Sequence, residues 1–139
     1  MKNTAVIGAG AFGTALSQIL VDAGADVTLW VREPDLCQTI ADTRENTLFM
    51  PGYRLPAQVH PTTDLHEAIA GRDLVVVAVP TAFIRGVMGE ASQSFAEDSV
   101  LLTVSKGIEV DTGLTMADVL REVLPLPLHR NLAFLSGPS

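Results

Sequence analysis

The sequence contains a single cysteine, Cys37, among its 139 residues. One thiol excludes an intrachain disulfide and a cluster of cysteine thiolates around a metal ion, and the lack of disulfides fits a reducing cytoplasm. His60, His66 and His129 are scattered along the chain without the spacing of metal ligands, and we expect all three to be exposed. The sequence therefore predicts no metal site and a cytoplasmic location.

Long apolar runs and clusters of basic residues are also missing. No segment approaches the roughly 20 consecutive apolar residues of a membrane helix, and the short apolar segment at the N-terminus fits a strand better than a signal peptide. Lys and Arg together number 9 against 16 Asp and Glu, which gives a formal net charge of -7. We therefore expect neither nucleic acid nor an anionic membrane surface as a partner.

Apolar residues are abundant and make up 47% of the sequence, while charged residues make up 18%. This balance is typical of a chain with a well-buried core and argues against disorder. A length of 139 residues is enough for one such domain and too short for two.

A G-x-G-x-x-G motif, formed by Gly8, Gly10 and Gly13, lies between an apolar run at 3–7 and apolar residues at helical spacing from 15 to 23. In a strand–turn–helix unit, the first glycine allows the tight turn and the second lets a pyrophosphate approach the backbone. The third lets the helix lie close to the sheet, and N–H groups at the helix start bind the anion. We interpret the motif as a dinucleotide site; the alternative is a glycine-rich turn that binds nothing.

Strand and helix patterns alternate along the whole chain. Strands are predicted at 3–7, 26–31, 74–79, 100–104 and 131–135, with helices ending near residues 23, 43, 71, 91 and 124. The proline-rich segment 44–61 is expected to be irregular, with a short strand near Val59. This order predicts an α/β fold, a doubly wound and mostly parallel Rossmann-type sheet that forms a single domain over residues 1–139.

Ligands of such sheets bind beyond the carboxyl ends of the strands, where the strand order reverses. Arg32 follows Gly13 by 19 residues, near the position where NAD-specific proteins place a carboxylate on the ribose 2′-hydroxyl. A guanidinium there can bind a 2′-phosphate or stack on adenine, which favours NADP. Two other interpretations stay open: adjacent Glu33 takes the NAD role, or Arg32 is a solvated loop charge.

Lys106 follows an apolar strand, so its ammonium group could attract an anionic substrate or polarise a carbonyl, unless it is a solvated loop lysine. Phe12 is expected to pack under the first helix with its backbone N–H toward the phosphate. Phe49 and Phe83 could flank a cofactor ring, although aromatic residues at such places more often belong to the core. Glu109 falls in a predicted turn with no evident partner.

Six short motifs are spread over essentially the whole chain. They are Gly8-Ala-Gly-Ala-Phe-Gly-Thr14, Leu29-Trp30-Val31-Arg32, Asn46 with Phe49-Met50-Pro51-Gly52, Val79-Pro80, Ser105-Lys106-Gly107-Ile108-Glu109 and Ser136-Gly137-Pro138-Ser139. Together they resemble the bacterial NAD(P)-dependent glycerol-3-phosphate dehydrogenases. The last two motifs, in their order and spacing, are far more specific than the glycine fingerprint.

The resemblance implies an enzyme that interconverts dihydroxyacetone phosphate and sn-glycerol 3-phosphate, a precursor of phospholipids, with NADP(H) or alternatively NAD(H). It implies that Ala11, Phe12 and Arg32 contact the cofactor beside the three glycines. Lys106 would contact both cofactor and substrate. Gly137 and Ser139 would line the site of the small phosphorylated substrate, and the full-length protein would be a homodimer.

Two departures from the family pattern matter. Ala11 stands where the family often has serine, so only its backbone N–H can serve the phosphate. The family's proton-transferring lysine and most of its substrate ligands lie in a helical second domain, which we expect to be absent from this chain. The chain is then the N-terminal NAD(P)-binding half, carries no catalytic residue of its own, and binds cofactor with little or no turnover.

Two other functions compete with this interpretation. Ketopantoate reductases share the glycine fingerprint and an arginine after the second strand, but we expect Asn-Gly where this chain has Lys106-Gly107. Nucleotide-sensing regulatory domains have a similar length, but they place a carboxylate at the position of Arg32.

Overall fold

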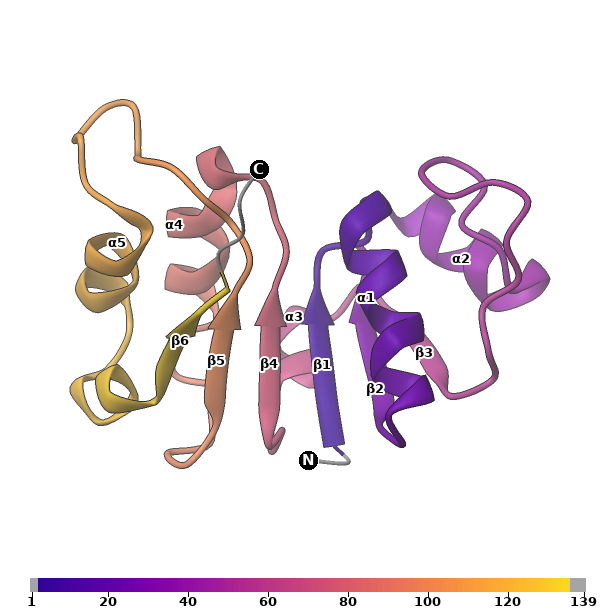
Figure 1. Cartoon of the computed structure of the whole chain (residues 1–139), viewed down its shortest axis with the longest axis horizontal. Helices are drawn as coiled ribbons and strands as arrows, with labels where there is room; N and C mark the ends of the chain where they lie inside the picture. The colour runs from indigo at the N-terminus through magenta and orange to yellow at the C-terminus, as the bar shows by residue number, and fades with distance from the viewer. Residues whose placement is uncertain (1–2, 136–139) are drawn as a thin grey trace.

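The computed structural model describes residues 3–135, in which a six-stranded sheet is covered by helices on both faces (Figure 1). Its elements are β1 (Asn3–Ile7), α1 (Ala11–Asp22), β2 (Asp26–Trp30), α2 (Pro34–Thr43), β3 (Val59–Thr62), α3 (Leu65–Ile69), β4 (Leu74–Val77), α4 (Thr81–Glu90), β5 (Val100–Thr103), α5 (Met116–Val123), the 3-10 helix η1 (Leu126–Asn131) and β6 (Leu132–Phe134).

The strands lie in the order β3-β2-β1-β4-β5-β6, and every neighbouring pair is parallel. The chain moves outward from β1 to β3 and then returns to place β4 on the other side of β1, so the strand order reverses between β1 and β4 (Figure 1). This arrangement confirms the predicted doubly wound Rossmann-type fold, including the short strand near Val59.

Two apolar clusters hold the helices on the sheet, one on each face. Val75 and Val77 of β4 pack into the cluster with α3, α4 and α5, while Val76 between them packs into the cluster with α1 and α2. Because successive side chains of a strand point to opposite faces, a strand covered on both sides has to be apolar throughout. The apolar run in this part of the sequence therefore marks the centre of the sheet.

The starts of α3 and α5 are capped by polar side chains. The Asp64 carboxylate accepts a hydrogen bond from the backbone N–H of Glu67 at 3.0 Å, and the Thr115 hydroxyl accepts one from Asp118 at 3.2 Å. Each bond satisfies an amide of the first turn that no helical carbonyl can reach.

Some predicted boundaries were wrong. β4 ends at Val77 instead of Val79, because its neighbour β1 ends at Ile7 in the glycine turn; the Ala78 amide still donates to the Ile7 carbonyl at 2.8 Å, but no residue of β1 follows for Val79 to pair with. β6 is shorter than the predicted 131–135, and η1 before it was not predicted. Leu128 donates to the Pro125 carbonyl at 3.0 Å in that tight turn, a local bond that apolar spacing does not reveal.

Candidate functional site

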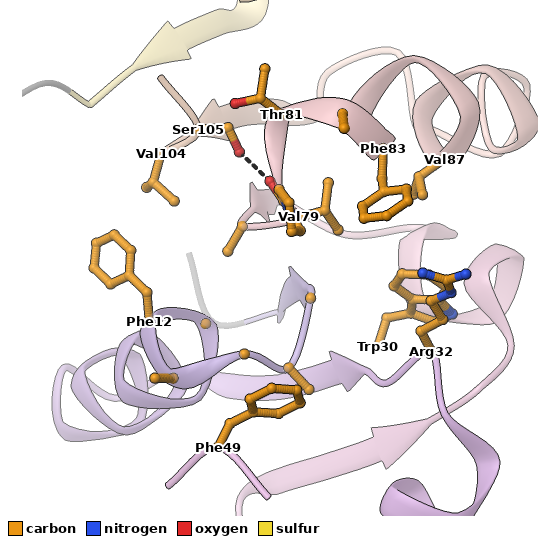
Figure 2. A pocket seen from close by; sticks show the side chains of 18 of the residues that line it. Phe12, Trp30, Arg32, Phe49, Val79, Thr81, Phe83, Val87, Val104 and Ser105 are labelled. Atoms are coloured by element: carbon orange, nitrogen blue, oxygen red, sulfur yellow. Dashed lines mark hydrogen bonds between the residues drawn. The ribbon is translucent and has the colours of Figure 1, made fainter. Parts of the chain in front are cut away.

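A cleft of about 870 Å³ opens at the carboxyl ends of β1 and β4, where the strand order reverses. Its walls come from the glycine turn, the end of β2 with the loop after it, the loops after β4 and β5, one side of α4 along its length, and Phe49 from the long segment between α2 and β3. Figure 2 shows Phe12 toward one end of the cleft and Arg32 with Phe83 toward the other. Segments far apart in the sequence thus meet at the predicted sheet edge.

The three glycines of the motif have different steric environments. Gly8 has φ +118°, and a Cβ there would lie 2.7 Å from the Ala78 carbonyl oxygen. A Cβ on Gly13 would lie 2.0 Å from the Gly8 carbonyl oxygen, so α1 packs directly on the turn. A Cβ on Gly10 would meet nothing within 4 Å. Packing therefore demands glycine at two positions, whereas at Gly10 the space that a Cβ would take belongs to the cleft.

The start of α1 supplies hydrogen-bond donors beside this space. The first helical bond runs from the Thr14 amide to the Gly10 carbonyl at 3.0 Å. The amides of Ala11, Phe12 and Gly13 precede it and have no carbonyl one turn back to bind. The first turn of α1 carries no acidic side chain. Free amides, the positive end of a helix dipole and an open backbone fit a diphosphate group.

Phe12 contradicts the expectation that it packs under the first helix. Its side chain is 54% exposed and lines the cleft (Figure 2). The buried residues of α1 are Gly13, Thr14 and Ser17, and because each residue turns about 100° around a helix, Phe12 lies on the other side. The residues of α1 that face the sheet are small, so the helix lies close to the sheet and leaves no space between them for a phenyl ring.

Arg32 lies just beyond β2, is exposed, and lines the cleft as predicted. Its guanidinium carbon lies 5.0 Å from the centre of the Phe83 ring, a cation–π distance. Phe83 from α4 is 47% exposed and Phe49 is 42% exposed, so neither is a core residue and both line the cleft. Glu33 lines it as well. At this end of the cleft, the Phe83 ring can stack on a flat heterocycle and the Arg32 guanidinium can bind a phosphate.

Lys106 is exposed in the loop that leaves β5, at the sheet edge where the sequence placed it. Two hydrogen bonds tie this loop to the segment that leads from β4 into α4. The Thr81 hydroxyl donates to the Lys106 carbonyl at 2.7 Å, and the Ser105 hydroxyl donates to the Val79 carbonyl at 2.6 Å (Figure 2). Ser105 lines the cleft, and Lys106 is the next residue along the chain.

The expectation that Glu109 has no partner was wrong. Its carboxylate accepts two hydrogen bonds from the Arg85 guanidinium, at 2.8 and 3.0 Å, and one from the Thr112 hydroxyl at 2.6 Å. These donors hold the pKa of Glu109 below its ordinary value, and the same carboxylate raises the pKa of Arg85. Arg85 also contacts Glu122 at 3.3 Å, so the loop after β5 is joined to both α4 and α5.

Asn46 is a residue near the site whose role sequence reasoning missed. It is fully buried beneath the glycine turn and donates to the Ala9 carbonyl at 2.8 Å. The only sequence signal near it is the motif of Asn46 with Phe49-Met50-Pro51-Gly52. No local pattern predicts a contact across 37 residues.

The remaining predictions have mixed outcomes. His60 and His66 are exposed as expected, but His129 is half-buried and its Nε2 lies 2.9 Å from the Leu124 carbonyl oxygen.

Within residues 3–135, no group of His, Cys, Asp or Glu is arranged to hold a metal ion. No helix in the same range is both long and apolar enough to cross a membrane. Gly137 and Ser139 lie outside the described residues.

Residues 3–139 match the family model of the NAD-dependent glycerol-3-phosphate dehydrogenase N-terminus. The chain belongs to this family. Among curated relatives, a glycerol-3-phosphate dehydrogenase [NAD(P)+] of Geobacter sp. (strain M21) is 45% identical over 99% of this chain and 41% of its own length. The crystal structure of a glycerol-3-phosphate dehydrogenase from Coxiella burnetii superposes with a TM-score of 0.83 at 26% identity, covering 99% of this chain and 42% of that one.

The chain therefore spans about two fifths of the length of these relatives. A ketopantoate reductase from Ralstonia eutropha JMP134 has a related fold, with a TM-score of 0.70 at 25% identity over 94% of this chain and 39% of that one. The lower TM-score favours the dehydrogenase family over the ketopantoate reductase alternative, and the family match favours it over both that alternative and the nucleotide sensor.

Proposed function

We propose that this chain is the cofactor-binding half of an oxidoreductase that transfers a hydride between NAD(P)H and dihydroxyacetone phosphate, forming sn-glycerol 3-phosphate. The observation that carries the proposal is the open space at Gly10, bordered by free helix amides in the cleft where the strand order reverses. Membership of the dehydrogenase family supports the same reaction.

Each candidate residue has a proposed role. The turn from Gly8 to Gly13 binds the diphosphate through backbone amides, and Ala11 and Phe12 contribute theirs from the first turn of α1. When bound, the nicotinamide ring supplies or accepts the hydride. Lys106 attracts the phosphorylated substrate toward the cofactor end of the sheet edge. Gly137 and Ser139, which lie outside the described residues, are proposed substrate contacts carried over from the family.

Arg32 is proposed to recognise the 2′-phosphate of NADP(H). Titration of NADPH and NADH should give tighter binding of NADPH to the parent chain, and Arg32→Ala should remove most of the difference. A charge-assisted hydrogen bond contributes about 1.5–3 kcal/mol, so the expected loss of discrimination is about 10- to 100-fold. Trp30, the only tryptophan, lines the cleft and gives the fluorescence signal.

Arg130→Ala serves as the matched control, because this exposed arginine lies in η1 and does not line the cleft. It should leave both affinities unchanged. Equal affinities of the parent chain for the two cofactors would contradict the role of Arg32, and failure to bind either cofactor would contradict the proposed function.

Turnover by the 139-residue chain is expected to be slight. Hydride transfer requires the ketone to be held against the nicotinamide, and we propose that the relatives hold it largely with residues beyond the two fifths that this chain matches. NADPH absorbance with dihydroxyacetone phosphate should therefore fall far more slowly than with a full-length relative at equal concentration. Steady-state oxidation at the rate of the relative would refute this prediction.

Two broader features remain proposals. We place the protein in the cytoplasm, which is compatible with one half-buried thiol, Cys37, whose pKa is raised by burial.

We also propose that the full-length protein is a homodimer, as the family resemblance implies; sedimentation of the full-length protein would test it.

A further inference from the structure

Asn46 makes three hydrogen bonds from a fully buried position beneath the glycine turn. Its Nδ2 donates to the Ala9 carbonyl oxygen at 2.8 Å and to the Thr14 hydroxyl at 2.9 Å. Its Oδ1 accepts from the Phe49 amide at 3.0 Å. Thr14 is also fully buried, and its hydroxyl lies 3.4 Å from the same Ala9 oxygen. Two side chains thus fix the direction of one carbonyl group.

That carbonyl belongs to the peptide group that joins Ala9 to Gly10. In a trans peptide, the C=O and the following N–H lie in one plane and point in opposite directions. Holding the Ala9 oxygen toward buried Asn46 therefore turns the Gly10 N–H away from it. Ala9 and Gly10 both line the cleft, and no Cβ shields the backbone at Gly10.

We propose that Asn46 is a positioning residue that orients the Ala9–Gly10 peptide so that its N–H serves the diphosphate of the cofactor. This inference rests on the proposed function and extends it to a residue that does not line the cleft. Through Oδ1, the same amide fixes the backbone of Phe49, whose ring lines the cleft below the turn (Figure 2). Asn46 therefore couples the long segment between α2 and β3 to the diphosphate site.

The geometry requires a group that donates on one side and accepts on the other, which the asparagine amide provides and an aspartate carboxylate does not. Asn46→Asp keeps the size and the acceptor for Phe49 but places a carboxylate oxygen against the Ala9 carbonyl. The two oxygens repel each other, which favours rotation of the peptide away from its parent orientation, and only the long bond from the Thr14 hydroxyl opposes it. Binding of NADP+ should weaken about tenfold or more, as expected when one hydrogen bond to a charged group is lost.

A ligand without the diphosphate distinguishes orientation of this peptide from general damage to the cleft. Adenosine 2′-phosphate has the adenosine and 2′-phosphate of NADP+ but no diphosphate, so Asn46→Asp should leave its affinity within about twofold. Trp30 fluorescence reports both ligands. Asn131→Asp is the matched control, because Asn131 is bonded to the Glu97 carbonyl beyond the cleft and its replacement should change neither affinity.

A second pair of variants tests the same peptide without adding charge. Thr14→Val keeps the shape but removes the hydroxyl that accepts from Asn46, and it should weaken NADP+ while sparing adenosine 2′-phosphate. Thr14→Ser restores the hydroxyl and should restore NADP+ binding to near the parent value. If Asn46→Asp does not fold, this pair of variants tests the proposed orientation of the Ala9–Gly10 peptide.

The affinities of these variants for NADP+ and adenosine 2′-phosphate distinguish the proposal from its alternatives. Selective loss of NADP+ affinity in Asn46→Asp or Thr14→Val, with rescue by Thr14→Ser, supports the proposal. Parent-like NADP+ affinity in both variants, or equal weakening of both ligands, overturns it. A parent chain that fails to bind NADP+ at all refutes the proposed function itself.

Discussion

Gly10→Ala is expected to abolish tight cofactor binding while the chain stays folded. The added Cβ meets no protein atom within 4 Å, and Gly10 has φ -69° and ψ -175°, which alanine adopts easily. The methyl group instead takes the space proposed for the diphosphate. Displacing that group from two amides loses two charge-assisted hydrogen bonds of about 1.5–3 kcal/mol each, so the Kd for NADPH should rise about 100-fold or more.

Titration by Trp30 fluorescence measures this loss, and urea unfolding measures the fold. Gly10 is the N-cap of α1, where alanine is a poorer cap than glycine, so a stability loss of up to about 1 kcal/mol is expected. Gly89→Ala in α4 is the control, because its Cβ also meets nothing and the residue does not line the cleft. Retention of parent affinity in Gly10→Ala would place the diphosphate elsewhere.

Gly13→Ala is expected to fail for the opposite reason, through loss of the fold. Its Cβ would lie 2.0 Å from the Gly8 carbonyl oxygen and 3.1 Å from the Gly8 carbonyl carbon. Both are backbone atoms of a turn already held at positive φ, so α1 must move off the sheet. The free energy of unfolding should fall by about 3 kcal/mol, the upper end of the usual cost of overpacking, or by more.

Urea unfolding of Gly13→Ala beside Gly89→Ala checks this prediction. Replacing a glycine by alanine in a helix interior normally stabilises the helix by about 0.5–1 kcal/mol, and Gly89→Ala, in the last turn of α4, should show a gain no larger than that. The two substitutions are chemically identical and differ in the space around the Cβ. A Gly13→Ala chain as stable as the parent would show that α1 does not pack on the turn as closely as the structure has it.

Much of the fold and part of the site could be predicted because the signals are local. The unbroken apolar run of β4, the capping residues Asp64 and Thr115, and the glycine motif each act on neighbours in the chain. Parallel strands then bring their carboxyl ends to one edge, which is why Arg32 was correctly placed at the cleft and Lys106 at the same sheet edge from sequence position alone.

The sequence by itself determined the sheet, the sheet edge at which the cleft opens and the backbone of the glycine turn, because these depend on residues close together in the chain. Only the tertiary structure decided that Phe12 faces the cleft, that Arg85 holds Glu109 across 24 residues, and that Asn46 reaches Ala9. These features depend on which helix face meets the sheet and on which distant side chains share a buried space. No spacing rule along the chain contains that information.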